Sequence, residues 1–319
     1  MKRHIVIICL AFGLGGTSPT AANTDVGGPP GSPRFQRAVQ DLKAGRNISA
    51  AQAARQLIEH GASTPAPQAV MGLALGRQGL CSHALPHLAS AKGTRTYIGF
   101  QGSVTHADCL RAAGQGREAW GVRQESMNWN RHDQHVVNTL VSGVEDLVSA
   151  SAWDEATELA HRAIMTNPSS VVAHTSMARV LLAQGDLSGA ELHHWVARLN
   201  TPRRTAAMHV NQAGIAEAYG DVIGAAAAWR RARKRNTKDI HIVAQYVGWL
   251  RRVGHLDRAM SVIEERRVGA KQSSEMLIES IRVRLERNEL EAARMVWGRL
   301  ANLYPDHPMT VALLKEIDG

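Results

Sequence analysis

The sequence predicts an all-α chain in which about eight helix-turn-helix repeats stack into an α-α superhelix. Composition gives the first indication, because the 319 residues include 47 alanines but only 4% aromatic residues. Alanine favours helices and lets neighbouring helices approach closely, whereas sandwiches and barrels need aromatic and β-branched strands. A turn residue that recurs every 34 to 37 positions is the second indication, since such a period is typical of helical repeat arrays.

The recurring turn residue is a glycine in six of the eight repeats. The eight turn residues are Gly45, Gly79, Gly114, Ser151, Gly185, Gly220, Gly254 and Asn288. Glycine and asparagine suit the left-handed backbone conformation that often follows the end of a helix. Each turn is followed by a segment whose apolar residues recur with helical spacing. These segments begin with Asp, Ser, Asn or Glu, which are favoured at helix N-termini. We therefore expect two helices in each repeat.

Residues 1–22 have the layout of a secretory signal peptide. Lys2 and Arg3 precede an apolar run over residues 5–14, and a stretch of small residues ends at Ala22, where we expect cleavage. A membrane anchor is the alternative, but ten apolar residues span only about half of the hydrocarbon thickness. Cys9 lies inside the apolar run, which disfavours a lipoprotein. We expect a periplasmic or secreted chain in which residues 23–33, rich in Gly and Pro, form a flexible lead-in.

The clearest repeat, residues 171–204, carries large and small side chains in a regular order on its two helices. Its pattern residues are Met177, Ala178, Leu181, Gly185, Leu187, Ala190, His194, Ala197 and Pro202. Residues 137–170 and 274–307 show the same order independently, and weaker copies cover the rest of the chain. This order resembles that of the tetratricopeptide repeat (TPR). Together with the signal-like N-terminus, it resembles an exported bacterial TPR protein. The resemblance implies a TPR solenoid over residues 34–307, although Arg34 and Arg37 stand where the family has apolar residues.

Residues 308–319 are expected to form a capping helix, because the end repeats of a solenoid need a polar outer face. Within it, Val311, Leu314 and Lys315 are spaced for one buried face.

No catalytic motif is recognisable in the sequence. Gly-x-Ser-x-Gly, Walker-type, His-Glu-x-x-His and Cys-x-x-Cys-His patterns are all absent. We therefore expect a non-enzymatic protein without a cofactor or a metal. The formal charge of +9 is spread along the chain, so it is only weak evidence for a polyanionic ligand.

Cys81 and Cys109 are the only cysteines left after removal of the signal peptide. They are expected on two antiparallel helices at similar heights, and in an oxidising compartment two such cysteines usually form a disulfide. Two separate buried thiols are the alternative. His83, His87 and His106 lie nearby, so a zinc site with both thiolates is a further, weaker alternative.

A basic run follows Trp229 near the end of one predicted repeat. It consists of Arg230, Arg231, Arg233, Lys234, Arg235 and Lys238. The simplest interpretation is a solvated helix face whose cations suit the C-terminal end of the helix dipole. The alternative is a convex basic patch that binds an anionic envelope polymer or a lipid surface. Nucleic acid is not an expected partner of an exported chain.

The TPR resemblance implies a concave groove, lined by the first helices of successive repeats, that receives a peptide or a helix. Position by position, the groove residues are Asn138, Val141, Glu145, Thr175, Arg179, Val210, Asn211, Glu217, His241, Gln245, Arg251, Ile278, Glu279 and Arg282. The family variant that grips a C-terminal carboxylate is not matched, because its Lys and Asn positions hold other residues here. We expect a scaffold for a protein partner in cell-envelope assembly, secretion or appendage biogenesis. The sequence does not predict the oligomeric state.

Overall fold

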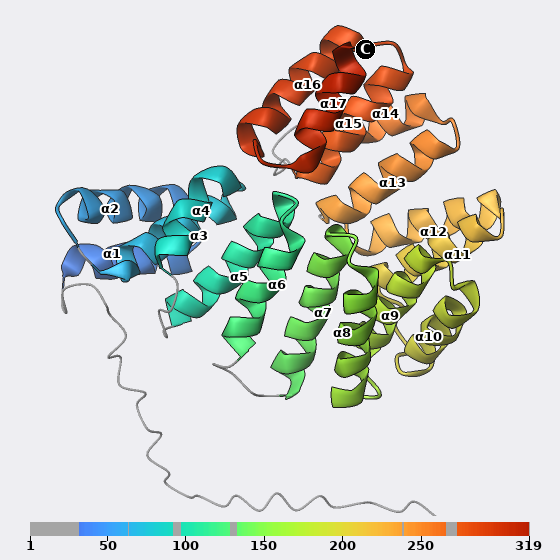
Figure 1. Cartoon of the computed structure of the whole chain (residues 1–319), viewed down its shortest axis with the longest axis horizontal. Coiled ribbons are helices and arrows are strands. Elements are labelled where there is room, and N and C mark those ends of the chain that lie inside the picture. Colours follow the sequence, from blue (N-terminus) through green and yellow to red (C-terminus); the bar gives the residue numbers. More distant parts are fainter. Residues whose placement is uncertain are drawn as a thin grey trace, which may run out of the picture.

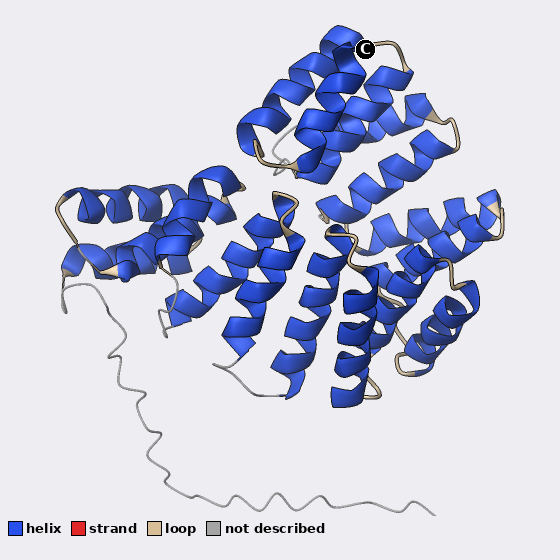
Figure 2. Cartoon of the chain, viewed as in Figure 1, coloured by secondary structure: helices blue, strands red, loops and turns tan. Residues whose placement is uncertain are grey.

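The computed structural model describes residues 32–62, 64–91, 97–127, 133–237, 239–265 and 273–318. The predicted signal peptide, nearly all of the lead-in and Lys238 lie outside these residues. Within them the chain forms seventeen helices and no strand (Figure 2). The helices are α1 (Pro33–Lys43), α2 (Asn47–Glu59), α3 (Pro65–Arg77), α4 (Cys81–Ser90), α5 (Tyr97–Ala112), α6 (Gly116–Met127), α7 (Asp133–Ser149), α8 (Trp153–Thr166), α9 (Val171–Gln184), α10 (Leu187–Leu199), α11 (Ala206–Ala218), α12 (Val222–Arg235), α13 (Ile240–Arg252), α14 (Leu256–Glu265), α15 (Ser274–Glu286), α16 (Leu290–Leu303) and α17 (Pro308–Asp318).

All eight predicted turn residues adopt a positive φ angle, from 54° at Ser151 to 83° at Gly185. Each therefore ends the first helix of a pair in the left-handed conformation that the sequence predicts. The turn after α9 shows how the next helix begins: the Asp186 amide donates to the Leu181 carbonyl at 2.9 Å. The Asp186 carboxylate in turn accepts a hydrogen bond from the Gly189 amide at 2.9 Å, which caps α10. The predicted pairing of helices around these turns is confirmed.

Successive helices pack against each other along the chain (Figure 1). Odd-numbered helices contact the next odd-numbered helix at α1–α3, α3–α5, α7–α9, α9–α11, α13–α15 and α15–α17. At the steps from α5 to α7 and from α11 to α13, the contact passes through α6 and α12 instead. In the described part of the chain, no two consecutive even-numbered helices approach as closely. The odd-numbered helices therefore form the inner, more tightly curved layer, and the even-numbered helices form the outer layer.

Small side chains lie where the helices cross. Ala156, Ala190, Ala225, Ala259 and Ala293 occupy equivalent positions in successive outer helices, and all five are fully buried. An alanine at each crossing lets two helix backbones approach closely, and the larger buried side chains then fill the space between the pairs. The high alanine content of the sequence is thus explained by the repeated helix crossings.

The C-terminal helices fold back onto the turn between α5 and α6 (Figure 1). A Cβ atom placed on Gly114 in that turn would lie 2.6 Å from Cδ of Pro308, the first residue of α17. Buried side chains of α4 and α5, including Leu88 and Cys109, belong to the same apolar cluster as Leu300 and Leu313. The superhelix is therefore closed by a contact between its middle and its C-terminal end.

The capping helix forms as predicted, but the prediction of its buried face was wrong. Thr310, Leu313 and Ile317 are buried, whereas Val311 is 62% exposed and Lys315 is also exposed. The predicted residues and the residues that are actually buried both recur with the spacing of one helix face, so the sequence pattern alone did not distinguish the two faces. The choice comes from tertiary contacts, because the Thr310 hydroxyl donates to the Tyr304 carbonyl at 2.9 Å. No helix in the described part of the chain is long and apolar enough to cross a bilayer.

Candidate functional site

The structure places all fourteen predicted groove residues on the inner layer. They come from α7, α9, α11, α13 and α15, all of which are odd-numbered helices. Asn138, His241 and Gln245 are exposed, and most of the other side chains are partly exposed. The inner face therefore presents a row of polar and aliphatic side chains from successive repeats.

Three of the predicted residues are buried between repeats. Thr175, Asn211 and Ile278 are 7%, 3% and 7% exposed. The Asn211 side-chain amide donates to the Thr175 carbonyl at 2.8 Å, which ties α11 to α9. In this conformation these side chains hold neighbouring inner helices together, and a partner would not reach them.

Ion pairs between neighbouring inner helices neutralise most of the charges on this face. Arg179 of α9 pairs with Glu145 of α7. Arg251 of α13 lies 3.0 Å from Glu279 of α15, which also accepts a hydrogen bond from Arg282 at 3.1 Å. Most charges on the inner face are thus paired with opposite charges, so this face has no large excess of positive or negative charge.

Glu217 joins three helices at the step from α11 to α13. It accepts a hydrogen bond from the Trp229 indole of α12 at 2.9 Å and one from Arg252 of α13 at 3.0 Å. Because α11 and α13 make few direct contacts, these hydrogen bonds connect the two inner helices.

A histidine–glutamate pair lies at the start of α13 and α15. Nδ1 of His241 lies 3.1 Å from Oε1 of Glu275, so the imidazole N–H donates to the carboxylate. This hydrogen bond raises the pKa of His241. Burial alone would raise the pKa of Glu275, but the hydrogen bonds from His241 and Ser273 and the charge of His241 outweigh it and lower that pKa to about 2.

Glu275 was not among the predicted residues, yet the sequence contains a signal for it. His241 and Glu275 are 34 residues apart, and so are Glu145 and Arg179. In a repeat array, complementary side chains one period apart lie side by side on neighbouring helices. The pairs could therefore have been found by comparing charges at equivalent positions of adjacent repeats.

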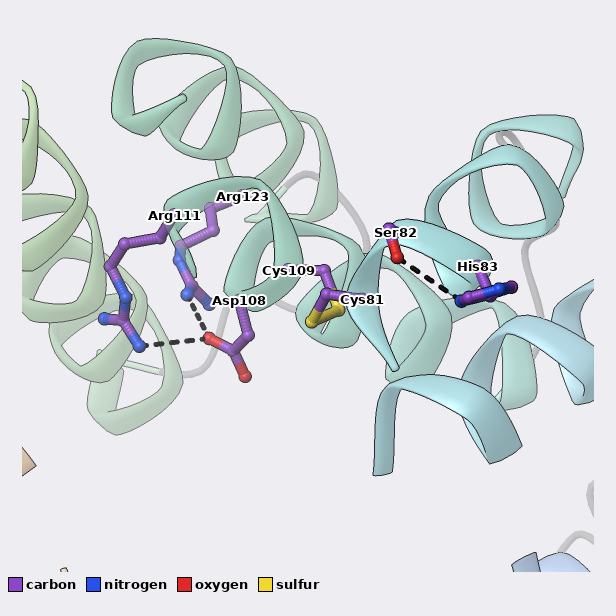
Figure 3. The surroundings of a disulfide bond; sticks show 7 residues. All are labelled: Cys81, Ser82, His83, Asp108, Cys109, Arg111 and Arg123. Carbon is purple, nitrogen blue, oxygen red and sulfur yellow. Dashed lines mark hydrogen bonds and ion pairs between the residues drawn. A yellow bond between two sulfur atoms is a disulfide. The ribbon is translucent and has the colours of Figure 1, made fainter. Parts of the chain in front are cut away.

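A charge network that joins α5, α6 and α7 was also missed, and Figure 3 shows the part of it in which Arg111 and Arg123 approach Asp108. Asp146 is fully buried, and its carboxylate accepts a hydrogen bond from Nε of Arg123 at 2.6 Å. The same guanidinium donates to Asp108 at 2.5 Å, and Arg111 lies 3.8 Å from Asp146. Burial raises the pKa of Asp146 to about 6, against the opposing effect of the two arginines. These contacts join three helices of two repeats, so no spacing within one repeat reveals them.

The predicted disulfide between Cys81 and Cys109 is confirmed (Figure 3). It joins α4 to α5, with Cα atoms 5.0 Å apart. Both sulfur atoms are thereby occupied, and Nδ1 of His87 lies 2.6 Å from the side-chain oxygen of Gln68. Among the residues that the structure describes, no group of three or more His, Cys, Asp or Glu side chains is arranged to hold a metal ion.

The predicted basic run lies on α12, and its members point in different directions. Arg233 turns toward the next repeat, where it lies 3.2 Å from Glu265 and 5.1 Å from the ring centroid of Tyr246. Arg230, Arg231, Lys234 and Arg235 are exposed. Trp229 is buried, as predicted for a packing position.

Comparison with known proteins gives a match at the level of the fold. No family model matches the sequence, and no curated protein matches it. The structure is similar to that of a tetratricopeptide repeat protein from Parabacteroides merdae, with a TM-score of 0.52 and 12% identity, over 90% of this chain and 98% of the other. Pseudomonas aeruginosa PilF gives a TM-score of 0.45 at 13% identity, over 66% of this chain and 93% of PilF. The chain has the fold of an all-α TPR solenoid, as the similarity to the Parabacteroides merdae protein shows.

Proposed function

We propose that this TPR-fold chain is a non-enzymatic scaffold whose inner face receives a segment of a partner protein. The observation that supports the proposal is the row of paired charges and aliphatic side chains along α7, α9, α11 and α13. Proteins of this fold offer such inner faces to peptides or helices, and function in repeat proteins lies in the surface that successive repeats build together.

The chemistry of this face favours an extended segment or an amphipathic helix with little net charge. Glu145 and Arg179 neutralise each other, and both are partly exposed, so their remaining lone pairs and N–H groups can bond with a partner backbone. Val141 of α7 and Val210 of α11 are half-buried on the same layer, and Gln245 of α13 is exposed further along. A partner would place apolar side chains on the two valines and polar groups on the neighbouring pairs.

The proposed setting is outside the cytoplasm, in envelope assembly, secretion or appendage biogenesis. The basis for this is the signal-like sequence of residues 1–22 together with the disulfide, because disulfides persist in oxidising compartments.

A charge swap tests the proposal. Arg179→Glu alone places two carboxylates side by side, whereas Glu145→Arg with Arg179→Glu restores a pair in the opposite order. The swapped variant keeps the fold, as its thermal unfolding would show, but presents reversed charges to a partner. We expect affinity purification after cross-linking in the native compartment to recover a protein partner with the wild type and several-fold less of it with the swapped variant. Recovery of no protein partner by the wild type, or equal recovery by both proteins, would contradict the proposal.

A further inference from the structure

The outer face of α10 carries large apolar side chains that nothing in the described chain covers. Leu192, Trp195 and Leu199 are 61%, 57% and 67% exposed. Their spacing places them on one side of the helix, opposite the fully buried Ala190 and Ala197. Single exposed apolar residues are common on protein surfaces, but an aligned leucine, tryptophan and leucine form a patch.

The helix that carries this patch and the segments that follow it also carry arginines. Arg198 of α10 and Arg204 of the following loop lie near His194, and Arg204, Arg231 and Arg235 lie near His209. Burial, together with these positive charges, lowers the pKa of both histidines. Arg198 lies on α10, Arg204 in the loop before α11, and Arg231 and Arg235 on α12, so the four arginines come from neighbouring segments, and Arg204 acts on both histidines.

These four arginines have no counter-charges of their own. Within the described residues, none of Arg198, Arg204, Arg231 and Arg235 lies within ion-pair distance of a carboxylate, although Glu191 also acts on His194. Residues 198–237 contain eight basic side chains and two acidic ones. Of the two acidic side chains, Glu217 is paired with Arg252, and Asp221 caps α12 by accepting from the Gly224 amide. The positive charge of these arginines is therefore available to an external anion.

We infer that this surface, which we term the α10–α12 surface and define by Leu192, Trp195, Leu199, Arg198, Arg231 and Arg235, docks on an anionic phospholipid bilayer. The charges are complementary to lipid phosphates, and basic residues near an anionic bilayer strengthen binding roughly additively. The apolar stripe decides between a bilayer and a soluble polyanion, because leucine and tryptophan gain nothing from a hydrated polymer but partition into the interface between headgroups and acyl chains.

The α10–α12 surface lies on the outer layer, so this inference goes beyond the proposed binding of a partner on the inner face. The two surfaces use different helix faces, and a chain docked by α10 and α12 would keep its inner face open. The chain would then hold its protein partner beside a membrane.

Vesicle sedimentation tests the inference. The full chain is mixed with vesicles of phosphatidylcholine alone or with about a third phosphatidylglycerol. All variants carry the same N-terminus, so any contribution from residues 1–31 cancels. We expect binding to the anionic vesicles, and a loss of at least about thirtyfold in affinity for Arg231→Glu with Arg235→Glu, which removes two favourable charges and adds two unfavourable ones. The matched control is Arg37→Glu with Arg299→Glu, which makes the same charge change on exposed residues of α1 and α16. The control should bind like the wild type.

A second pair of variants tests the apolar stripe. Trp195→Ala with Leu199→Ala should weaken vesicle binding several-fold, whereas Leu290→Ala with Met295→Ala, which truncates exposed side chains of α16, should leave it unchanged. Absence of binding to anionic vesicles would overturn the inference. So would equal losses in the two charge-reversed proteins, which would show an effect of net charge alone. Wild-type binding by the Trp195→Ala, Leu199→Ala variant would overturn the assignment to a bilayer and identify a surface for soluble anions, which retention on a heparin column would reveal.

Discussion

The closing contact between Gly114 and Pro308 leads to a sharp mutational prediction, because the chain offers a matched control. Gly114 and Gly254 are both turn residues with a φ angle of +79°. Alanine in this conformation costs about 1 to 2 kcal/mol at either position. At Gly254 an added Cβ would have nothing within 4 Å, whereas at Gly114 it would lie 2.6 Å from Cδ of Pro308.

The magnitude at Gly114 follows from this distance. Carbon atoms normally approach to about 3.5 Å, so Pro308 would have to move by roughly 1 Å, and its ring is rigid at the start of α17. Overpacking of this kind typically costs about 1 to 3 kcal/mol. We therefore expect Gly114→Ala to destabilise the protein by about 2 to 5 kcal/mol and Gly254→Ala by only about 1 to 2 kcal/mol.

Urea unfolding followed by circular dichroism measures both free energies, and small-angle X-ray scattering measures the shape. If the strain is relieved by separation of α17 from the α5–α6 turn, the radius of gyration of Gly114→Ala will rise while that of Gly254→Ala stays at the wild-type value. Equal destabilisation by the two substitutions, with no change in the radius of gyration of either, would refute the closed superhelix.

Three further predictions concern interactions that join neighbouring helices. His241 has a raised pKa and Glu275 a lowered one, so their pair contributes fully between about pH 4.5 and 6.5, fades as pH rises through the pKa of His241, and fades again as pH falls toward 2. Glu275→Gln should therefore lower the melting temperature more at pH 6 than at pH 9. An equal decrease at both pH values would contradict a stabilising ion pair between His241 and Glu275. So would the same pH dependence in the exposed control variant Glu264→Gln. The disulfide closes a loop with a sequence separation of 28, so replacing Cys81 and Cys109 by alanine should cost about 3.5 kcal/mol in urea unfolding; a cost below about 1 kcal/mol would count against a role in stability. Asn211→Ala removes a buried hydrogen bond to the Thr175 carbonyl and should lower the free energy of unfolding by about 1 to 3 kcal/mol. Because this bond joins only α9 and α11, hydrogen exchange should show reduced protection in these two helices alone.

The parts of the fold that sequence predicts well are those set by local chemistry. Gly185 and Asn288 mark turns because the left-handed conformation resists most other residues. Ala190 and Ala225 mark helix crossings because each crossing needs a small side chain in the same place. Both signals repeat with the period, so each copy reinforces the others.

The parts that sequence predicts poorly depend on contacts between different helices. The buried face of α17 is chosen by Tyr304 and by packing on α16, which the spacing of Val311 and Leu314 does not reveal. Thr175 and Asn211 were expected to be open to a partner because the family pattern places them on the inner helices, but the neighbouring repeat covers them. Asp146 of α7 was missed because its arginine partners come from two other helices, α5 and α6.

Site-specific photo-cross-linking tests the central claim, that the inner face receives a protein segment, most directly. A photoreactive amino acid replaces Gln245 on the inner layer in one protein and Ile48 of α2 in another. Both side chains are exposed, and Ile48 lies on the outer layer. In the native compartment we expect the probe at residue 245 to capture one defined protein, and Val210→Arg in the same chain to abolish that capture. The probe at residue 48 should not capture that protein. Capture of the same protein from both positions, or capture at residue 245 that survives Val210→Arg, would contradict binding in the groove.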